Sequence, residues 1–99
     1  MANKDLEITM KFLKNLEDEI RKEYKSEIIG IFGSYARGEQ RKSSDVDILV
    51  RFFERATLFD LVGLANFLEE KLNMKVDIVS EKAIRPELRE QILKQVVMV

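Results

Sequence analysis

Three aspartates of this sequence stand inside or at the start of short apolar runs that are typical of strands. Asp45 and Asp47 stand two residues apart at the start of an apolar run, and Asp77 lies between Val76 and Ile78. Alternate residues of a strand share one face of a sheet, so we expect Asp45 and Asp47 to project together. Carboxylates held close together repel one another, and a hard cation such as Mg²⁺ relieves that repulsion. If neighbouring strands carry the three acids, they form a candidate metal site.

Each aspartate also has an ordinary interpretation, as a turn or strand-end residue exposed to water. For Asp45 alone, which follows Ser43 and Ser44, the ordinary interpretation is favoured. For the three acids together with the loop before them, the metal site is favoured.

The loop before these acids has the composition of an anion-binding turn. Gly33 and Ser34 directly follow a short run rich in β-branched residues. A glycine lets the backbone approach a ligand closely, and successive N–H groups can hold phosphate oxygens. The Ser34 hydroxyl adds a donor. Such a turn is weak evidence alone, but beside a carboxylate cluster it indicates a nucleoside triphosphate site.

Composition narrows the chemistry further. The 99 residues include no Cys and no His, which argues against zinc, iron–sulfur and haem sites and excludes catalysis by histidine. The net charge of −1 gives no overall attraction to nucleic acid or to an anionic membrane. No apolar run approaches the roughly 20 residues of a membrane span. We expect a cytoplasmic protein.

Hydrophobic spacing predicts the elements that position these residues. It indicates an amphipathic helix over 4–24 and a second helix over 58–72, and Pro86 is suited to the first turn of a last helix. That last helix has an apolar stripe of Leu88, Ile92 and Val96. Strands are expected over 28–32, 45–53 and 76–79, with a loop over 33–44.

This order predicts an α/β (α+β) domain spanning 1–99, with a small mixed sheet of about three strands flanked by helices. The chain ends in four apolar residues, 96–99. They either complete the core or add a strand edge to a neighbouring chain, which leaves oligomerisation open.

The spacing of the loop and the acids resembles a known signature. Gly33-Ser34, ten residues, then Asp45-x-Asp47 is similar to the motif of the DNA polymerase β-like nucleotidyltransferase superfamily. The string GSYARGEQRKSSDVDILV resembles the minimal nucleotidyltransferases, the antitoxin half of HEPN/MNT toxin–antitoxin pairs. The residues of that pattern present here are Gly33, Ser34, Ala36, Arg37, Gly38, Ser44, Asp45 and Asp47. The segments KVDIVS and IRPELREQILKQVVMV also match, so the resemblance covers essentially the whole chain.

The resemblance implies roles for the candidate residues. Asp45 and Asp47 would hold two Mg²⁺ ions, and Asp77 would be the third catalytic carboxylate, a ligand of the catalytic metal that helps to deprotonate the acceptor. Gly33 and Ser34 would contact the β- and γ-phosphates of ATP. Two metals that clamp the attacking and leaving oxygens make a histidine unnecessary.

Two residues of the loop keep alternative interpretations. Arg37 either lies over the phosphates and neutralises their charge or pairs with Asp45 or a helix end. Tyr35 either packs in the interior or forms a platform near the nucleotide.

The resemblance implies a protein adenylyltransferase that moves AMP from ATP to a tyrosine hydroxyl of a cognate HEPN ribonuclease toxin. The enzyme would thereby act as the antitoxin. Without a basic stripe or an aromatic-rich sheet, a nucleic-acid acceptor is not favoured. One alternative is an antitoxin that neutralises its toxin by binding alone, although three unpaired acids argue against it. A second is a nucleotidyltransferase for a small molecule, which would need a further substrate domain.

Overall fold

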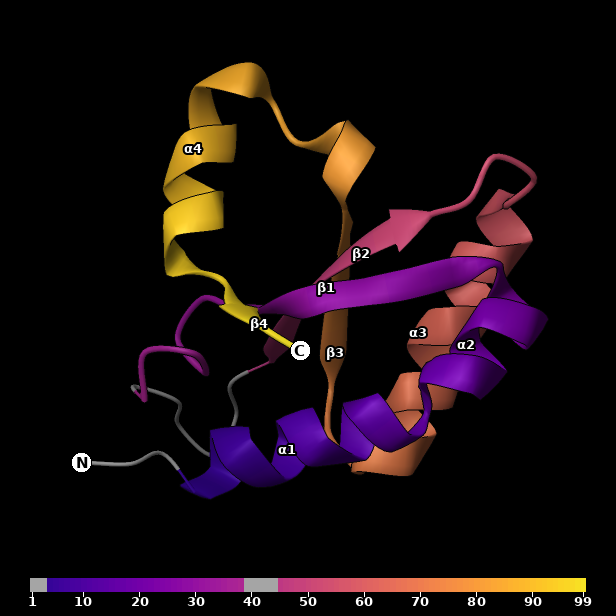
Figure 1. Ribbon diagram of the computed structural model, residues 1–99, viewed down its shortest axis with the longest axis horizontal. Coiled ribbons are helices and arrows are strands. Elements are labelled where there is room, and N and C mark those ends of the chain that lie inside the picture. The colour runs from indigo at the N-terminus through magenta and orange to yellow at the C-terminus, as the bar shows by residue number, and fades with distance from the viewer. Residues whose placement is uncertain (1–3, 39–44) are drawn as a thin grey trace.

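The computed structural model of the chain describes residues 4–38 and 45–99. Its elements are α1 (Lys4–Asn15), α2 (Glu17–Tyr24), β1 (Ser26–Phe32), β2 (Val46–Phe52), α3 (Leu58–Leu72), β3 (Val76–Ser80), the 3-10 turn η1 (Glu81–Ala83), α4 (Pro86–Gln95) and β4 (Val97–Met98) (Figure 1). The predicted α/β class is confirmed. Every helix in the described ranges is too short or too polar to cross a membrane.

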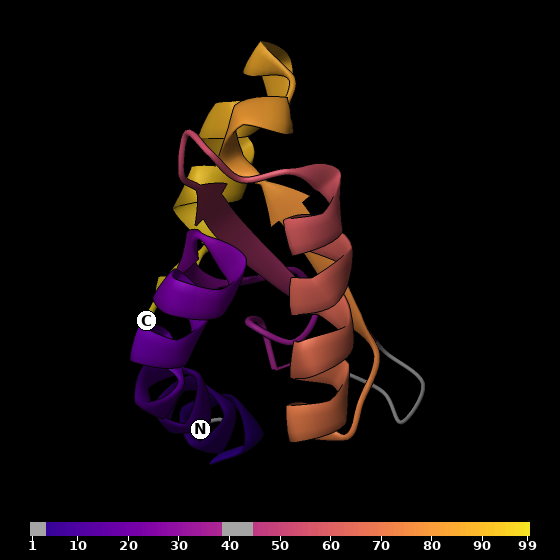
Figure 2. The same ribbon diagram turned by 90° about the vertical axis from the view of Figure 1, so that its right-hand side faces the viewer.

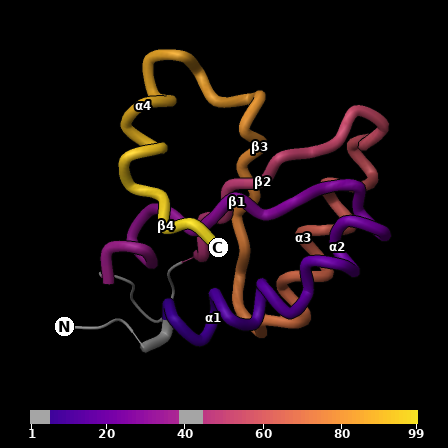
Figure 3. Tube along the Cα trace, viewed as in Figure 1, coloured from indigo at the N-terminus to yellow at the C-terminus, as the bar shows by residue number. Residues whose placement is uncertain are grey.

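The strands form one mixed sheet in the order β3-β2-β1-β4. β2 runs antiparallel to β1 and parallel to β3, and β4 pairs antiparallel with the outer edge of β1. The sheet therefore has four strands where the sequence indicated about three. The fourth comes from the apolar C-terminal residues, which pair with β1 of their own chain (Figure 3).

The prediction of one helix over 4–24 was wrong, because the chain forms two helices that meet at Leu16. The backbone N–H of Leu16 bonds the carbonyl of Leu13 at 3.0 Å, a tighter three-residue turn. Leu16 has φ −94° and ψ −1°, and α2 leaves the junction in a new direction (Figure 1). Leu13 and Ile20 are both fully buried, so the apolar period continues across the bend and does not reveal it.

The core lies on the face of the sheet that α1, α2 and α3 cover. Val46, Ile48 and Val50 of β2 are fully buried in one apolar cluster with residues of these helices. α3 runs alongside α2 (Figure 2), where the rings of Tyr24 and Phe67 lie 5.1 Å apart. Because strand residues alternate between faces, the residues of β2 between these three point to the opposite face.

The C-terminal part of the chain returns to the sheet from a separate position. α4 stands apart from the other helices (Figure 1) and begins at Pro86, as predicted. Its expected apolar stripe is only partly right, because the side chain of Leu88 is 46% exposed and Val96 follows the helix as its C-cap.

Candidate nucleotide and metal site

Asp47 and Asp77 lie side by side on the face of the sheet opposite the core. β2 and β3 are parallel neighbours, and their register pairs Asp47 with Asp77. The residues before them, Val46 and Val76, are also paired and belong to the core, so the two carboxylates project from the other face. Asp45 stands one residue before β2 and is exposed, as is Asp77, whereas Asp47 is half-buried. We call Asp45, Asp47 and Asp77 the acid cluster.

The environment of Asp47 disfavours its charged form. Burial raises its pKa above the ordinary value of 3.8, and the negative charges of Asp77 and Asp45 raise it further. The positive charge of Arg37 lowers the pKa of Asp47 in part. A cation bound at this place would stabilise the carboxylate by the same electrostatics, so the residues present fit a metal ion.

Within the described residues, no three acidic side chains lie close enough together to hold a metal ion by themselves. Magnesium in nucleotide enzymes is usually bound by one or two carboxylates together with substrate phosphates. The acid cluster therefore fits a cation that arrives with a nucleotide rather than a preformed protein cage.

Gly33 brings the loop after β1 against the acid cluster. Phe32, the last residue of β1, pairs with Asp47, and the chain then turns at Gly33 with φ of 79°. A Cβ atom at Gly33 would overlap the carboxylate of Asp47. Only glycine satisfies both conditions, the left-handed backbone and the contact with Asp47. Ser34 follows directly, so the turn predicted to bind phosphate adjoins the acid cluster.

Residues 33–38 form a compact turn. The N–H of Arg37 bonds the carbonyl of Gly33 at 3.2 Å, and the N–H of Gly38 bonds the carbonyl of Tyr35 at 3.3 Å. Tyr35 is buried in the core, with its hydroxyl 3.2 Å from the hydroxyl of Thr9 in α1. Of its two interpretations, packing is correct. Ser44, also part of the motif, lies outside the described residues.

Arg37 is exposed and acts electrostatically on Asp47, which places its guanidinium on the side of the acid cluster. It also donates a hydrogen bond of 3.4 Å to the side-chain oxygen of Gln95, the last residue of α4. This contact matches the interpretation in which Arg37 pairs with a helix end. It does not test the other interpretation, in which Arg37 contacts the phosphates. No pattern in the sequence links these two positions, so the contact of Gln95 was not predicted.

A row of paired charges crosses the structure away from the acid cluster. We call it the charge row: Arg21–Glu27 (2.7 Å), Glu27–Arg51 (3.0 Å), Arg51–Glu81 (3.0 Å) and Glu81–Arg89 (3.1 Å). It joins α2, β1, β2, η1 and α4. Because the charges along the row alternate in sign, each charged side chain is paired with one of opposite sign.

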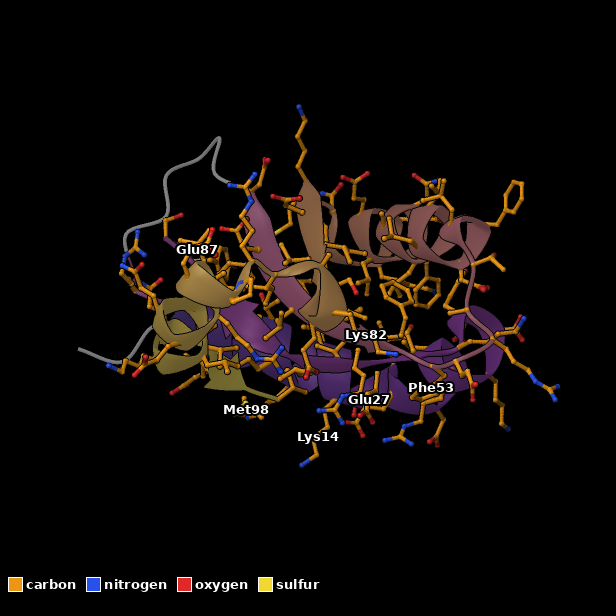
Figure 4. All side chains as sticks on the ribbon, turned by 90° about the horizontal axis from the view of Figure 1, so that it is seen from above. Lys14, Glu27, Phe53, Lys82, Glu87 and Met98 are labelled. Atoms are coloured by element: carbon orange, nitrogen blue, oxygen red, sulfur yellow. The ribbon has the colours of Figure 1, made fainter. Side chains whose placement is uncertain are left out.

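A pocket of about 260 Å³ adjoins this row near the C-terminus. Its lining residues are Glu17, Ile20, Arg21, Glu27, Ile28, Ile29, Arg51, Met98 and Val99, of which Glu27 and Met98 are marked in Figure 4. The acid cluster and Gly33 lie outside it, and its arginines are already paired with Glu27. The pocket is therefore distinct from the candidate nucleotide site.

Known proteins resemble this chain in both sequence and fold. The sequence model of the nucleotidyltransferase domain family matches residues 13–99. The protein adenylyltransferase MntA of Thermococcus cleftensis is 37% identical over 99 residues, which cover all of both chains. A solved structure described as a candidate minimal nucleotidyltransferase superposes with a TM-score of 0.82 at 37% identity, again over 100% of both chains. A crystal structure of a toxin–antitoxin complex with AMP-PNP has a TM-score of 0.68 at 28% identity, over 86% of this chain and 70% of that one.

Proposed function

This chain belongs to the nucleotidyltransferase domain family, and we propose that it transfers AMP from ATP to a hydroxyl group of a protein partner. The enzyme class, a nucleotidyltransferase, follows from the family itself. The acceptor, the metal and the roles of individual residues are our proposal. The observation that carries it is the contact between Gly33 and Asp47, with Asp77 in register beside them.

The reaction is an in-line displacement at the α-phosphorus of ATP. The acceptor oxygen forms a bond to that phosphorus, the bond to the β-phosphate oxygen breaks, and pyrophosphate leaves with the electron pair. Asp77 is exposed and lies beside Asp47, where it helps to take the proton of the acceptor hydroxyl. When bound, two Mg²⁺ ions would neutralise the phosphate charge and polarise the reacting oxygens.

The chain's own residues provide binding and orientation. Asp45 and Asp47, with Asp77, are suited to hold the metal ions. The turn that begins at Gly33 and Ser34 supplies donors for the β- and γ-phosphates, close to the carboxylate of Asp47. Arg37, which already acts on Asp47, adds positive charge on the phosphate side.

We propose that the acceptor is a tyrosine hydroxyl on a cognate HEPN ribonuclease toxin, and that the modification makes this chain its antitoxin. The full-length relative in Thermococcus cleftensis is named a protein adenylyltransferase, and the similar toxin–antitoxin structure contains an ATP analogue. We take residues 1–99 as a single catalytic domain in the cytoplasm. A binding-only antitoxin does not account for the carboxylates of the acid cluster.

The test combines the chain with its genomic neighbour, ATP and Mg²⁺, and measures the intact mass of the partner. We expect the mass to rise by whole AMP units. The double variant Asp45→Ala, Asp47→Ala should abolish the gain, whereas Asp18→Ala, which removes an exposed carboxylate from α2, should not. A mass gain that persists in the double variant would refute the assignment of Asp45 and Asp47 as metal ligands. A tight complex without any mass gain would establish the binding-only antitoxin.

A further inference from the structure

The end of α4 reaches the loop of the nucleotide site. The side-chain oxygen of Gln95 accepts a hydrogen bond of 3.4 Å from the guanidinium of Arg37, across 58 positions of sequence. Both side chains are at the surface. In Figure 3 the end of α4 that leads into β4 lies next to the loop that follows β1. Tertiary structure alone therefore brings this carboxamide to the loop.

The register of β4 explains why Gln95 lies there. Met98 pairs with Gly30 and Val97 with Ile31, so the chain just before Val97 runs beside the end of β1, where the loop begins. Gly30 permits this close crossing, since a Cβ atom there would lie 2.8 Å from Cγ2 of Val96. The position of Gln95 is thus set by backbone pairing and does not depend on its own weak hydrogen bond.

A neutral partner suits an arginine that must bind phosphate. The long side chain of Arg37 loses rotamer freedom when it is fixed on a ligand, and a contact that restrains it beforehand reduces that cost. A carboxamide oxygen accepts from the guanidinium without cancelling its charge. A carboxylate in the same place would compete with the phosphates for it.

We propose that Gln95 is a positioning residue, which orients Arg37 for the phosphates of ATP. The proposal rests on the proposed function, in which Arg37 contacts those phosphates. The segment α4–β4 then has two roles: it completes the sheet, and it completes the nucleotide site.

Calorimetric titration of the whole chain with MgATP tests this inference. We expect Gln95→Ala to weaken ATP affinity by roughly three- to tenfold, the effect of losing one hydrogen bond of ordinary net strength. Arg37→Ala should weaken it more, and the double variant should bind no more weakly than Arg37→Ala. Gln91→Ala removes the same side chain one turn earlier from an exposed position of α4, and it should bind as the wild type does.

Two further measurements separate positioning from support of the fold. In the transfer assay, Gln95→Ala should raise KM for ATP while kcat changes less. Gln95→Glu should weaken ATP binding more than Gln95→Ala without lowering the melting temperature, because its carboxylate retains Arg37.

The contrary outcomes are specific. Wild-type ATP affinity in Gln95→Ala would overturn the positioning role. So would an equal loss of ATP affinity when Gln95→Ala is introduced into the wild type and into the Arg37→Ala variant. If Arg37→Ala weakens binding and Gln95→Ala does not, this inference alone fails. If Arg37→Ala binds ATP as the wild type does, the inference fails together with the phosphate role of Arg37, whereas a failed transfer to the partner concerns only the proposed function.

Discussion

The charge row and the acid cluster treat charge in opposite ways, although both use the same strand. Arg51 in β2 lies between Glu27 and Glu81, and the hydrogen bond and charge of Glu81 raise the pKa of Arg51, which favours its charged form. Four residues earlier on the same face, Asp47 has two carboxylates for neighbours, and its raised pKa disfavours its charged form. Each charge of the charge row therefore has a partner of opposite sign, whereas the carboxylates of the acid cluster lie beside other carboxylates.

This difference separates a region that contributes to folding from a region suited to bind a cation. A pair of opposite charges at the surface contributes modestly to folding and needs no ligand. A cluster of like charges costs stability unless something neutralises it, and such perturbed groups concentrate at functional sites. The predictions below separate the two regions, in order of decreasing effect.

Asp47→Asn should have the largest effect, and in two opposite directions. Losing a metal ligand worth several kcal/mol should slow AMP transfer by about a thousandfold or more. The same variant should melt at a higher temperature than the wild type without metal, because burial of the charge and repulsion from Asp77 disappear. The rate of AMP transfer and the melting temperature, measured on one preparation, check the two expectations. A variant that remains active, or that melts below the wild type, would contradict the role given to the acid cluster.

Gly33→Ala should damage the contact between the loop and the acid cluster. The new Cβ atom meets the carboxylate of Asp47, and the backbone at φ 79° costs an L-residue about 1–2 kcal/mol. Gly38→Ala is the matched control, because Gly38 has a similar φ of 73°. We expect comparable backbone destabilisation in urea but a greater loss of ATP affinity for Gly33→Ala. Equal ATP affinities would remove Gly33 from the phosphate site.

The stability of the metal-free protein should depend on pH through Asp47. Because the native pKa of Asp47 is raised, the folded state holds a proton that the unfolded state releases at lower pH. The free energy of unfolding should therefore contain a component that falls as pH rises through the window above 3.8. Asp47→Asn should lack that component. Urea denaturation of the wild type and of Asp47→Asn across this pH window tests the sign of the pH dependence. Parallel plots of the free energy of unfolding against pH would contradict the raised pKa of Asp47.

Arg51→Gln should have the smallest effect, confined to stability. It removes the central member of the charge row, while Arg21 and Arg89 still pair with Glu27 and Glu81. We expect a small decrease in melting temperature that vanishes in high salt, with AMP transfer unchanged. Arg55→Gln, in the exposed loop after β2, controls for the loss of a positive charge. A large loss of transfer would mean that the two regions are coupled.

Local signals predicted most of the elements. The helix expected over 58–72 coincides with α3, whose start is fixed by a capping box between Thr57 and Asp60 and whose end is the left-handed Asn73. The strand predictions differ from β1, β2 and β3 by at most two residues at an end. These boundaries depend on residues that are close in sequence, so they can be predicted from the sequence.

Other features depend on contacts that a linear pattern does not contain. The bend at Leu16 preserves the apolar period, and the pairing of Val97 and Met98 with β1 requires Gly30 to admit the chain. For the same reason the contact between Arg37 and Gln95 was not foreseen.

The sequence by itself determined the chemistry available: the three aspartates of the acid cluster, a Gly-Ser turn, and neither histidine nor cysteine. It also indicated the family, because the spacing of the turn and the acids resembles the motif of that family. Only the tertiary structure decided that β3 lies parallel to β2 with Asp77 opposite Asp47, and that Gly33 touches the same carboxylate. The physical reason is that side-chain alternation fixes which face a residue occupies, whereas hydrogen bonding between distant strands fixes which residues meet there.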